Sequence, residues 1–214
     1  MAGAMFNPRF LVISLGNPAP YTETLHSVGH LALSSFQKKF PSEQPPFAAA
    51  RYGKKSVLAS AGRKYTLIQS PTLMNISGTW VARAWKEMLQ DQSLTPADLA
   101  LVLVHDDLEE DLGVVKIRQW NRSHRGHNGV KSVNASLRPC EYEGARWSRI
   151  SVGIGRPEGR DKSTVSDYVL RKMSKWEKSV IEDQGAPAVL GALVELEGKW
   201  EKEFAKSEAG AIQQ

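Results

Sequence analysis

The chain has 214 residues, of which 41% are hydrophobic and 24% charged, and its net charge is +5. This is an ordinary soluble composition, and the length allows one domain with a real core. The single Cys140 excludes an internal disulfide framework and a cysteine-clustered zinc site, and no apolar run approaches the length of a membrane span.

We expect a single domain over residues 1–214, with a core at about 9–205 and flexible termini. The first ten residues, MAGAMFNPRF, are too few and too poor in basic residues for a secretory or transit peptide. The expected location is therefore the cytoplasm, with the mitochondrion as an alternative.

Basic residues are concentrated in the middle of the chain. Residues 114–172 hold 13 Lys and Arg against 5 Asp and Glu, and the remainder has a small negative excess. This distribution suggests one face that meets a polyanion, whereas the simpler interpretation is a scattered set of solvated charges.

The first predicted strand is the apolar run Phe10–Leu15, which ends at the turn cluster Gly16-Asn17-Pro18. Apolar residues then recur at helical spacing as far as Phe36, so that His26 lies on the first turns of a helix. Asn17 and His26 therefore reach the carboxyl end of a strand, where ligands bind in open α/β sheets. The simpler alternatives are an Asn that only closes a turn and a histidine on a helix surface.

The rest of the chain alternates between strand and helix patterns. Further strands are predicted at 47–52, 56–60, 65–69, 99–104, 114–119 and 147–155. Helices are predicted after Gly78, from Gly126, near 175–183 and at 186–204, with a loop at 155–163. This order predicts a three-layer α/β/α fold around a mixed, twisted sheet.

Polar side chains follow several of these strands. Asn75 lies after the strand at 65–69, Asp106 after the strand at 99–104, and Asn128 at a helix start. If the strands are neighbours, these residues converge with Asn17 and His26 on one crevice. A histidine oriented by a carboxylate can activate water, and neutral amides can donate hydrogen bonds to an oxyanion.

Other chemistries fit the sequence less well. There is no Gly-x-Ser-x-Gly nucleophile elbow, and the histidines lack zinc-site spacing, so we expect no metal and no cofactor. The glycine run Gly153–Gly159 invites a dinucleotide-binding interpretation. Its third glycine does not match the Gly-x-Gly-x-x-Gly spacing, and Pro157 interrupts the run. The pattern therefore does not predict a helix N-terminus at which a pyrophosphate could bind.

Four sequence blocks, in order and at compatible spacing, resemble the bacterial-type peptidyl-tRNA hydrolase family. They are Leu15-Gly16-Asn17-Pro18 with Thr24-x-His26-x-x-Gly29, Pro71-Thr72-x-Met74-Asn75-x-Ser77-Gly78, His105-Asp106-Asp107-Leu108 with Gly113, and Gly126-His127-Asn128-Gly129. A fifth block, Arg149-x-x-x-Gly153-x-Gly155-x-Pro157, with Tyr168-Val169-Leu170, extends the resemblance to about residue 172.

The resemblance implies a hydrolase that cleaves the ester between a peptide and the ribose of its tRNA, and we expect it to be a monomer. It makes His26 the base that activates water and Asp106 its orienting carboxylate. Asn17 and Asn75 would hold the peptide and the reacting ester, and Asn128 would bind substrate and position the water or oxyanion. Arg118 and Arg149 fall about where the family grips the terminal phosphate of the tRNA, and Lys116 is expected to bind tRNA beside them. The simpler alternative for either arginine is a solvated side chain at a strand edge.

The sequence departs from the family pattern at Leu25, Ser27 and Leu73, and at a bulkier, more basic loop, Trp120–Arg125. These departures suggest a eukaryotic or organellar branch. Two other functions stay open: a non-enzymatic RNA-binding relative that keeps the cleft, and a generic esterase. The esterase would not explain the basic middle of the chain.

Overall fold

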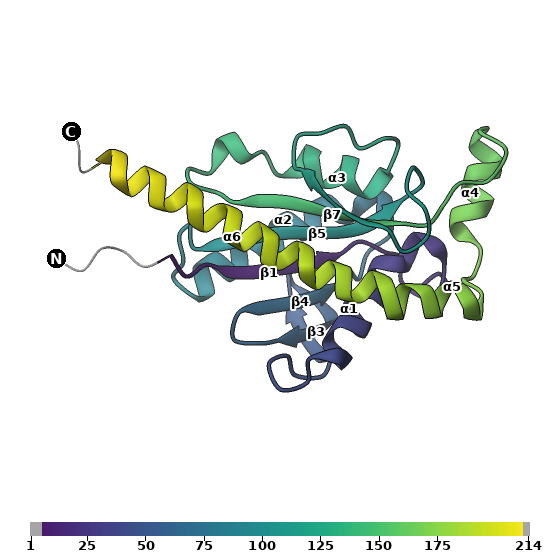
Figure 1. Ribbon diagram of the computed structural model, residues 1–214, viewed down its shortest axis with the longest axis horizontal. Helices are drawn as coiled ribbons and strands as arrows, with labels where there is room; N and C mark the ends of the chain where they lie inside the picture. Colours follow the sequence, from purple (N-terminus) through teal and green to yellow (C-terminus); the bar gives the residue numbers. More distant parts are fainter. Residues whose placement is uncertain (1–5, 212–214) are drawn as a thin grey trace.

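In the described part of the chain, seven strands form one mixed sheet in the order β2-β3-β4-β1-β5-β7-β6 (Figure 1). The computed structural model describes residues 6–211, so the expectation of flexible ends at 1–5 and 212–214 lies outside the described residues. The strands are β1 (Arg9–Ser14), β2 (Ala48–Tyr52), β3 (Lys55–Ala61), β4 (Tyr65–Gln69), β5 (Leu99–Asp107), β6 (Val115–Gln119) and β7 (Trp147–Gly153).

The four central strands, β4, β1, β5 and β7, run parallel, so their carboxyl ends meet at one edge of the sheet. The outer strands β2, β3 and β6 are antiparallel to their neighbours. The polar residues that follow β1, β4 and β5 in the sequence are thereby brought to the same end of the molecule.

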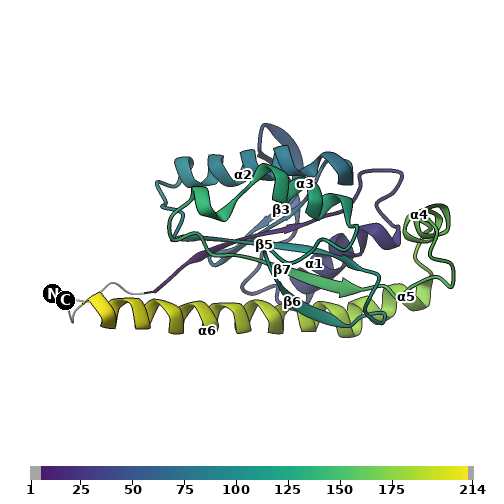
Figure 2. The ribbon, with the colours of Figure 1, turned by 90° about the horizontal axis from the view of Figure 1, so that it is seen from above.

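Helices cover both faces of the sheet, as the three-layer prediction required (Figure 2). In the part of the chain that the structure describes, no helix is both long and apolar enough to cross a membrane. The α-helices are α1 (Val28–Lys39), α2 (Ser77–Asp91), α3 (Asn128–Ser136), α4 (Lys162–Leu170), α5 (Lys175–Val180) and α6 (Ala186–Ala211). Short 3-10 turns occupy Leu25–Ser27 (η1), Met74–Ile76 (η2) and Pro139–Glu141 (η3), and a π-helical turn (η4) spans Ile181–Gly185.

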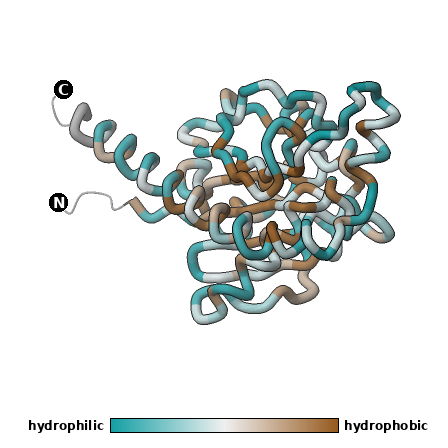
Figure 3. The backbone as a smooth tube through the Cα atoms, turned by 45° about the vertical axis from the view of Figure 1, so that its right-hand side comes forward, coloured by the Kyte–Doolittle hydropathy of each residue, from teal (hydrophilic) through white to brown (hydrophobic). Residues whose placement is uncertain are grey.

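The sheet separates two apolar clusters, and alternate residues of β5 belong to each. Leu99, Leu101 and Leu103 pack with α2 and α3, whereas Val102 and Val104 pack with α1 and α6. All nine residues of β5 are buried, which explains why its first six residues are a continuous apolar run instead of an alternating pattern. Figure 3 shows the hydrophobic residues gathered along the central strands.

Strand β5 extends three residues beyond the predicted end at Val104. His105, Asp106 and Asp107 pair with Ser151, Val152 and Gly153 of β7, so Asp106 lies in the strand and not after it. Pairing with β7 continues after the apolar run stops, which the residue pattern alone does not reveal.

Two helical segments also differ from the prediction. Helix α4 has one buried residue, Val169, and therefore lacks the apolar stripe by which a helix is recognised in a sequence. The two predicted C-terminal helices are joined by η4, whose flanking residues Val180 and Ala186 keep right-handed helical dihedrals. Helix α6 then continues to Ala211, beyond the predicted end at Phe204.

Two helical glycines offer a matched test of packing. A methyl group on Gly78 of α2 would clash with the carbonyl oxygen of Ser132 in α3, whereas one on the exposed Gly191 of α6 would meet nothing within 4 Å. We expect Gly78→Ala to lower the free energy of unfolding by about 1–3 kcal/mol through overpacking. Gly191→Ala should raise it by about 0.5–1 kcal/mol because alanine favours the helix.

Urea titration of both variants checks this pair. A Gly78→Ala protein as stable as the wild type would mean that α2 and α3 can move apart without loss, contrary to the close approach of their backbones.

Candidate active site

A cavity of about 1170 Å³ opens at the carboxyl ends of the parallel strands. Its wall is formed by the β1–η1 loop, by η2, by the end of β5, by β6, by the loop that leads into α3 and by α4. The cavity contains five of the residues singled out in the sequence as candidates for chemistry: Asn17, His26, Asn75, Asp106 and Asn128. These come from separate regions of the chain, as the strand-end argument expected.

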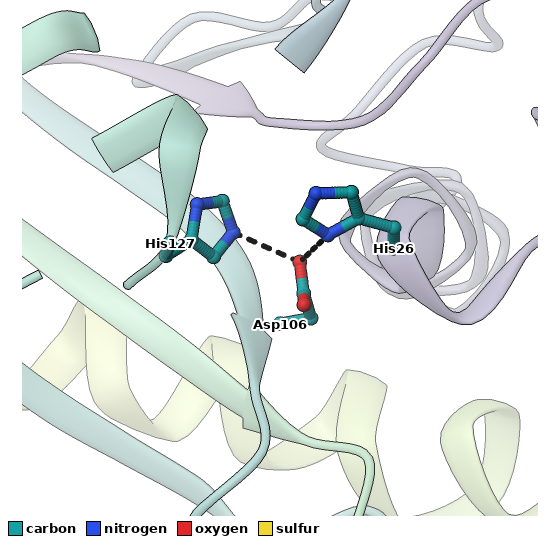
Figure 4. A group of neighbouring side chains, drawn as sticks. All are labelled: His26, Asp106 and His127. Atoms are coloured by element: carbon teal, nitrogen blue, oxygen red, sulfur yellow. Dashed lines mark hydrogen bonds and ion pairs between the residues drawn. The ribbon is translucent and has the colours of Figure 1, made fainter. Parts of the chain in front are cut away.

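Two histidines share one oxygen of a buried carboxylate (Figure 4). Nδ1 of His26 and Nε2 of His127 each lie 2.9 Å from Oδ1 of Asp106. His26 belongs to η1, Asp106 to the end of β5, and His127 precedes α3, so three elements distant in sequence meet at this atom. Asp106 is only 4% exposed.

His127 also caps helix α3. Its Nδ1 accepts hydrogen bonds from the backbone N–H groups of Gly129 and Val130, at 3.1 and 3.2 Å. A ring nitrogen that accepts in this way carries no proton, so the hydrogen-bond pattern assigns the proton to Nε2. His127 is therefore a neutral imidazole that donates Nε2–H to Asp106.

His26 faces Asp106 through its other ring nitrogen. Its Nδ1–H donates to Asp106, which leaves the lone pair of Nε2 free to accept a proton. Burial alone would lower the pKa of His26, but the charge of Asp106 and the hydrogen bond to it raise the pKa above 6.5. A base of this kind is well matched to chemistry near neutral pH.

Asp106 stays ionised despite its burial. Burial would raise the pKa of the carboxyl group, but the two imidazoles that donate to it hold the pKa well below its ordinary value of 3.8. The neighbouring His105 differs, because burial lowers its pKa to about 3 and keeps it neutral. His105 therefore does not compete with His26 as a base at neutral pH.

His26, Asp106 and His127 also bring three potential metal ligands together. One ligand atom from each residue lies within 4.8 Å of the others. However, Nε2 of His127 carries a proton as long as Nδ1 caps α3, so binding a cation there would cost the cap or the proton. The arrangement fits a hydrogen-bonded triad better than a coordination site.

The three asparagines present their amides in two ways. The Oδ1 of Asn17 accepts a hydrogen bond from the backbone N–H of Met74 at 2.8 Å, so this side chain links the loop after β1 to η2. Asn75 and Asn128 are exposed to the cavity, and their side chains make no hydrogen bond with another described residue. Their amides are therefore available to a ligand.

The basic residues implied by the resemblance are placed differently from one another. Arg118 lines the cavity, but its Nη2 already donates to Asp107 and Glu110, at 2.9 and 2.6 Å. Lys116 does not line the cavity and pairs with Glu110 at 2.7 Å.

Arg149 lies beneath the loop that follows β6. Its side chain is only 2% exposed, and its Nη2 donates to the carbonyls of Gln119 and Arg122, at 3.0 and 2.8 Å. The structure thus gives Arg149 a contact with the loop backbone, which sequence reasoning did not foresee.

Sequence reasoning missed two parts of the site. His127 was weighed only as a zinc ligand, although its place directly before a predicted helix start is that of an N-cap. The second part is an exposed basic rim around the cavity, which the sequence indicated only as an excess of charge over 114–172. Its members are Arg122, Arg125, Arg156, Arg160 and Lys162.

Comparisons with known proteins agree with this geometry. A model of the peptidyl-tRNA hydrolase family matches residues 11–211. The chain is 35% identical over 176 residues to a probable peptidyl-tRNA hydrolase of Schizosaccharomyces pombe, covering 80% of this chain and 75% of the relative. It is 34% identical over 191 residues to the peptidyl-tRNA hydrolase of Geobacter metallireducens, covering 88% and 87%.

Solved structures support the fold independently. The crystal structure of peptidyl-tRNA hydrolase from Acinetobacter baumannii matches with a TM-score of 0.62 at 22% identity, over 91% of this chain and 97% of that one. With the family model matching almost the whole sheet and its covering helices, the chain belongs to the peptidyl-tRNA hydrolase family.

Proposed function

We propose that this protein hydrolyses the ester bond between a peptide and the ribose of its tRNA. The observation that carries the proposal is the pair of His26 and Asp106, whose Nδ1 and Oδ1 atoms are 2.9 Å apart in a cavity lined by three asparagines. The exposed basic rim suits the phosphates of an RNA substrate. Family membership supplies the substrate class, since the relatives are named peptidyl-tRNA hydrolases.

In the proposed first step, Nε2 of His26 takes a proton from a water molecule, whose oxygen attacks the ester carbonyl carbon. The resulting imidazolium is stabilised by the negative charge of Asp106, which also keeps Nδ1 protonated. The carbonyl oxygen becomes an oxyanion, and we assign its stabilisation to the amides of Asn75 and Asn128, which line the same cavity as His26.

In the second step the tetrahedral intermediate collapses. The bond from the carbonyl carbon to the ribose oxygen breaks, and the leaving ribose oxygen takes the proton from His26, which restores the neutral base. The peptide leaves as a carboxylic acid and the tRNA with a free hydroxyl. We assign His127 a positioning role, because it holds the oxygen of Asp106 to which His26 donates.

We further propose that the protein acts as a monomeric single domain. All the residues assigned to the reaction come from one chain and line one cavity, so the chemistry does not require a second subunit. Because the substrate is a product of translation, the cytoplasm remains the expected compartment, with the mitochondrion as the alternative.

The direct test is release of free tRNA from an N-blocked aminoacyl-tRNA by wild type and by His26→Ala. We expect kcat to fall by about 10²- to 10⁴-fold, the usual contribution of a general base. Binding of deacylated tRNA should stay close to wild type, whereas the melting temperature should fall, because the buried Asp106 loses one of its two donors and keeps only His127. Turnover by His26→Ala near the wild-type rate would remove His26 from this role, and tRNA binding without turnover in both proteins would favour an RNA-binding function.

Asp106→Asn separates the charge of this residue from its shape. Asn keeps an oxygen acceptor for both histidines but removes the negative charge that opposes the effect of burial on His26, so the pKa of His26 should fall. Activity depends on neutral His26, so in wild type it rises with pH through a midpoint above 6.5. The variant's midpoint should move to lower pH, with a plateau lower by about tenfold or more because the base is weaker.

Profiles of kcat/KM against pH from 5 to 9 check this expectation, and NMR titration of the His26 ring gives its pKa directly. An unchanged midpoint in Asp106→Asn would show that the carboxylate charge does not set the basicity of His26.

Arg149 and Lys162 should affect tRNA binding in different ways. Lys162 is an exposed cation of the basic rim. In a plot of the logarithm of the tRNA-binding constant against the logarithm of the salt concentration, Lys162→Ala should therefore make the slope less steep by about one, the change for one lost phosphate contact. The buried Arg149 instead holds two loop carbonyls, so Arg149→Ala should weaken binding with the slope unchanged. Fluorescence anisotropy with labelled tRNA at several salt concentrations measures both. A reduced slope in Arg149→Ala would place its guanidinium on a phosphate.

A further inference from the structure

We propose that Trp176, with the flanking Lys172 and Lys175, forms a second RNA contact outside the cavity, in which the indole ring stacks on an unpaired nucleobase near the acceptor end of the substrate. This inference rests on the proposed function, because it takes the substrate to be a tRNA. It adds a contact that none of the assigned site residues makes.

Trp176 is exceptional among the tryptophans of this chain. It is 68% exposed, whereas the other five are all buried in the core. Those five are Trp80, Trp85, Trp120, Trp147 and Trp200. A large aromatic ring in water loses the stabilisation that burial would give it, which points to a partner.

The chain places this ring close to the mouth of the cavity. Leu170 lines the cavity, and the six residues from there to Trp176 can span at most about 20 Å. Lys172 forms a β-bridge with Thr24, two residues before His26, and the N–H of Met173 donates to the carbonyl of Glu23 at 2.9 Å. Helices α4 and α5 accordingly lie at the same end of the molecule (Figures 1 and 2).

The corner that carries Trp176 is well fixed. Ser174 and Glu177 form a capping box at the start of α5, and the buried Glu177 also accepts both guanidinium N–H groups of Arg171. The guanidinium of Arg171 in turn lies over the ring of Tyr168, 4.8 Å from its centroid. Trp176 is therefore presented from an ordered helix start, which lowers the entropic cost of stacking on a ligand.

The charges around Trp176 favour RNA over other partners. Among the described residues, Arg171 and Lys178 are paired with Glu177 and Glu23, but Lys172 and Lys175 have no ion-pair partner. Free cations beside an exposed aromatic ring are the elements of a single-stranded nucleic-acid contact. A protein partner or a lipid surface would be better served by a contiguous apolar patch than by one ring between lysines.

The test compares Trp176→Ala with Trp176→Phe and with Val194→Ala, which removes an exposed apolar side chain from α6. We expect Trp176→Ala to weaken binding of deacylated tRNA, and to raise KM for peptidyl-tRNA, by about 5- to 100-fold, the range for loss of one stacked base. The kcat should stay within about twofold of wild type. Trp176→Phe should retain most of the affinity, and Val194→Ala should bind as wild type does.

Unchanged tRNA affinity in Trp176→Ala would overturn the inference. A KM that rises only with longer peptides, while tRNA affinity stays constant, would also overturn it and assign the ring to the peptide. The binding measurement does not depend on turnover. If Trp176→Ala weakens binding and the wild type does not hydrolyse its substrate, the proposed function fails while this contact stands.

Discussion

A buried negative charge at Asp106 governs the arrangement of the site. Burying a carboxylate away from water costs about several kcal/mol unless hydrogen-bond donors of the protein replace the lost hydration. Here two imidazole N–H groups converge on one oxygen of this carboxylate. The two donors come from η1 and from the residue that caps α3, so both segments are held against the end of β5. The catalytic geometry and the local fold therefore satisfy the same electrostatic demand.

The sheet makes this convergence possible because its two faces pack against the apolar clusters, whereas the polar residues lie at the edge where the parallel strands end. Alternate residues of β5 fill the two apolar clusters, and the strand then continues for three polar residues at the edge. The hydrophobic core holds the four parallel strands in register, so their carboxyl ends reach the cavity together. Apolar burial thus supplies the precision, and the polar strand ends supply the chemistry.

The sequence was informative wherever a residue pattern reflects burial. The runs at Phe10–Leu15 and 99–104 predicted the central strands, and their polar ends predicted that Asn17, His26 and Asp106 would meet. Helix α4 was not predicted, because it buries only Val169 and so leaves no apolar pattern in the sequence. The hydrogen bonds of His127 and the burial of Arg149 were not predicted either, because each depends on a contact with a segment that is distant in the sequence.

The two ring nitrogens of His127 limit which residues evolution can substitute at this position. Ser or Asp could cap α3, but an aspartate has no proton to give to Asp106, and a serine hydroxyl engaged at the cap is short. Lys or Arg could donate to the carboxylate, but neither has an acceptor for the helix. A side chain with an acceptor and a donor on opposite sides of a rigid ring meets both needs. Variation here would have to be compensated at two places at once, in the helix and in the carboxylate pair.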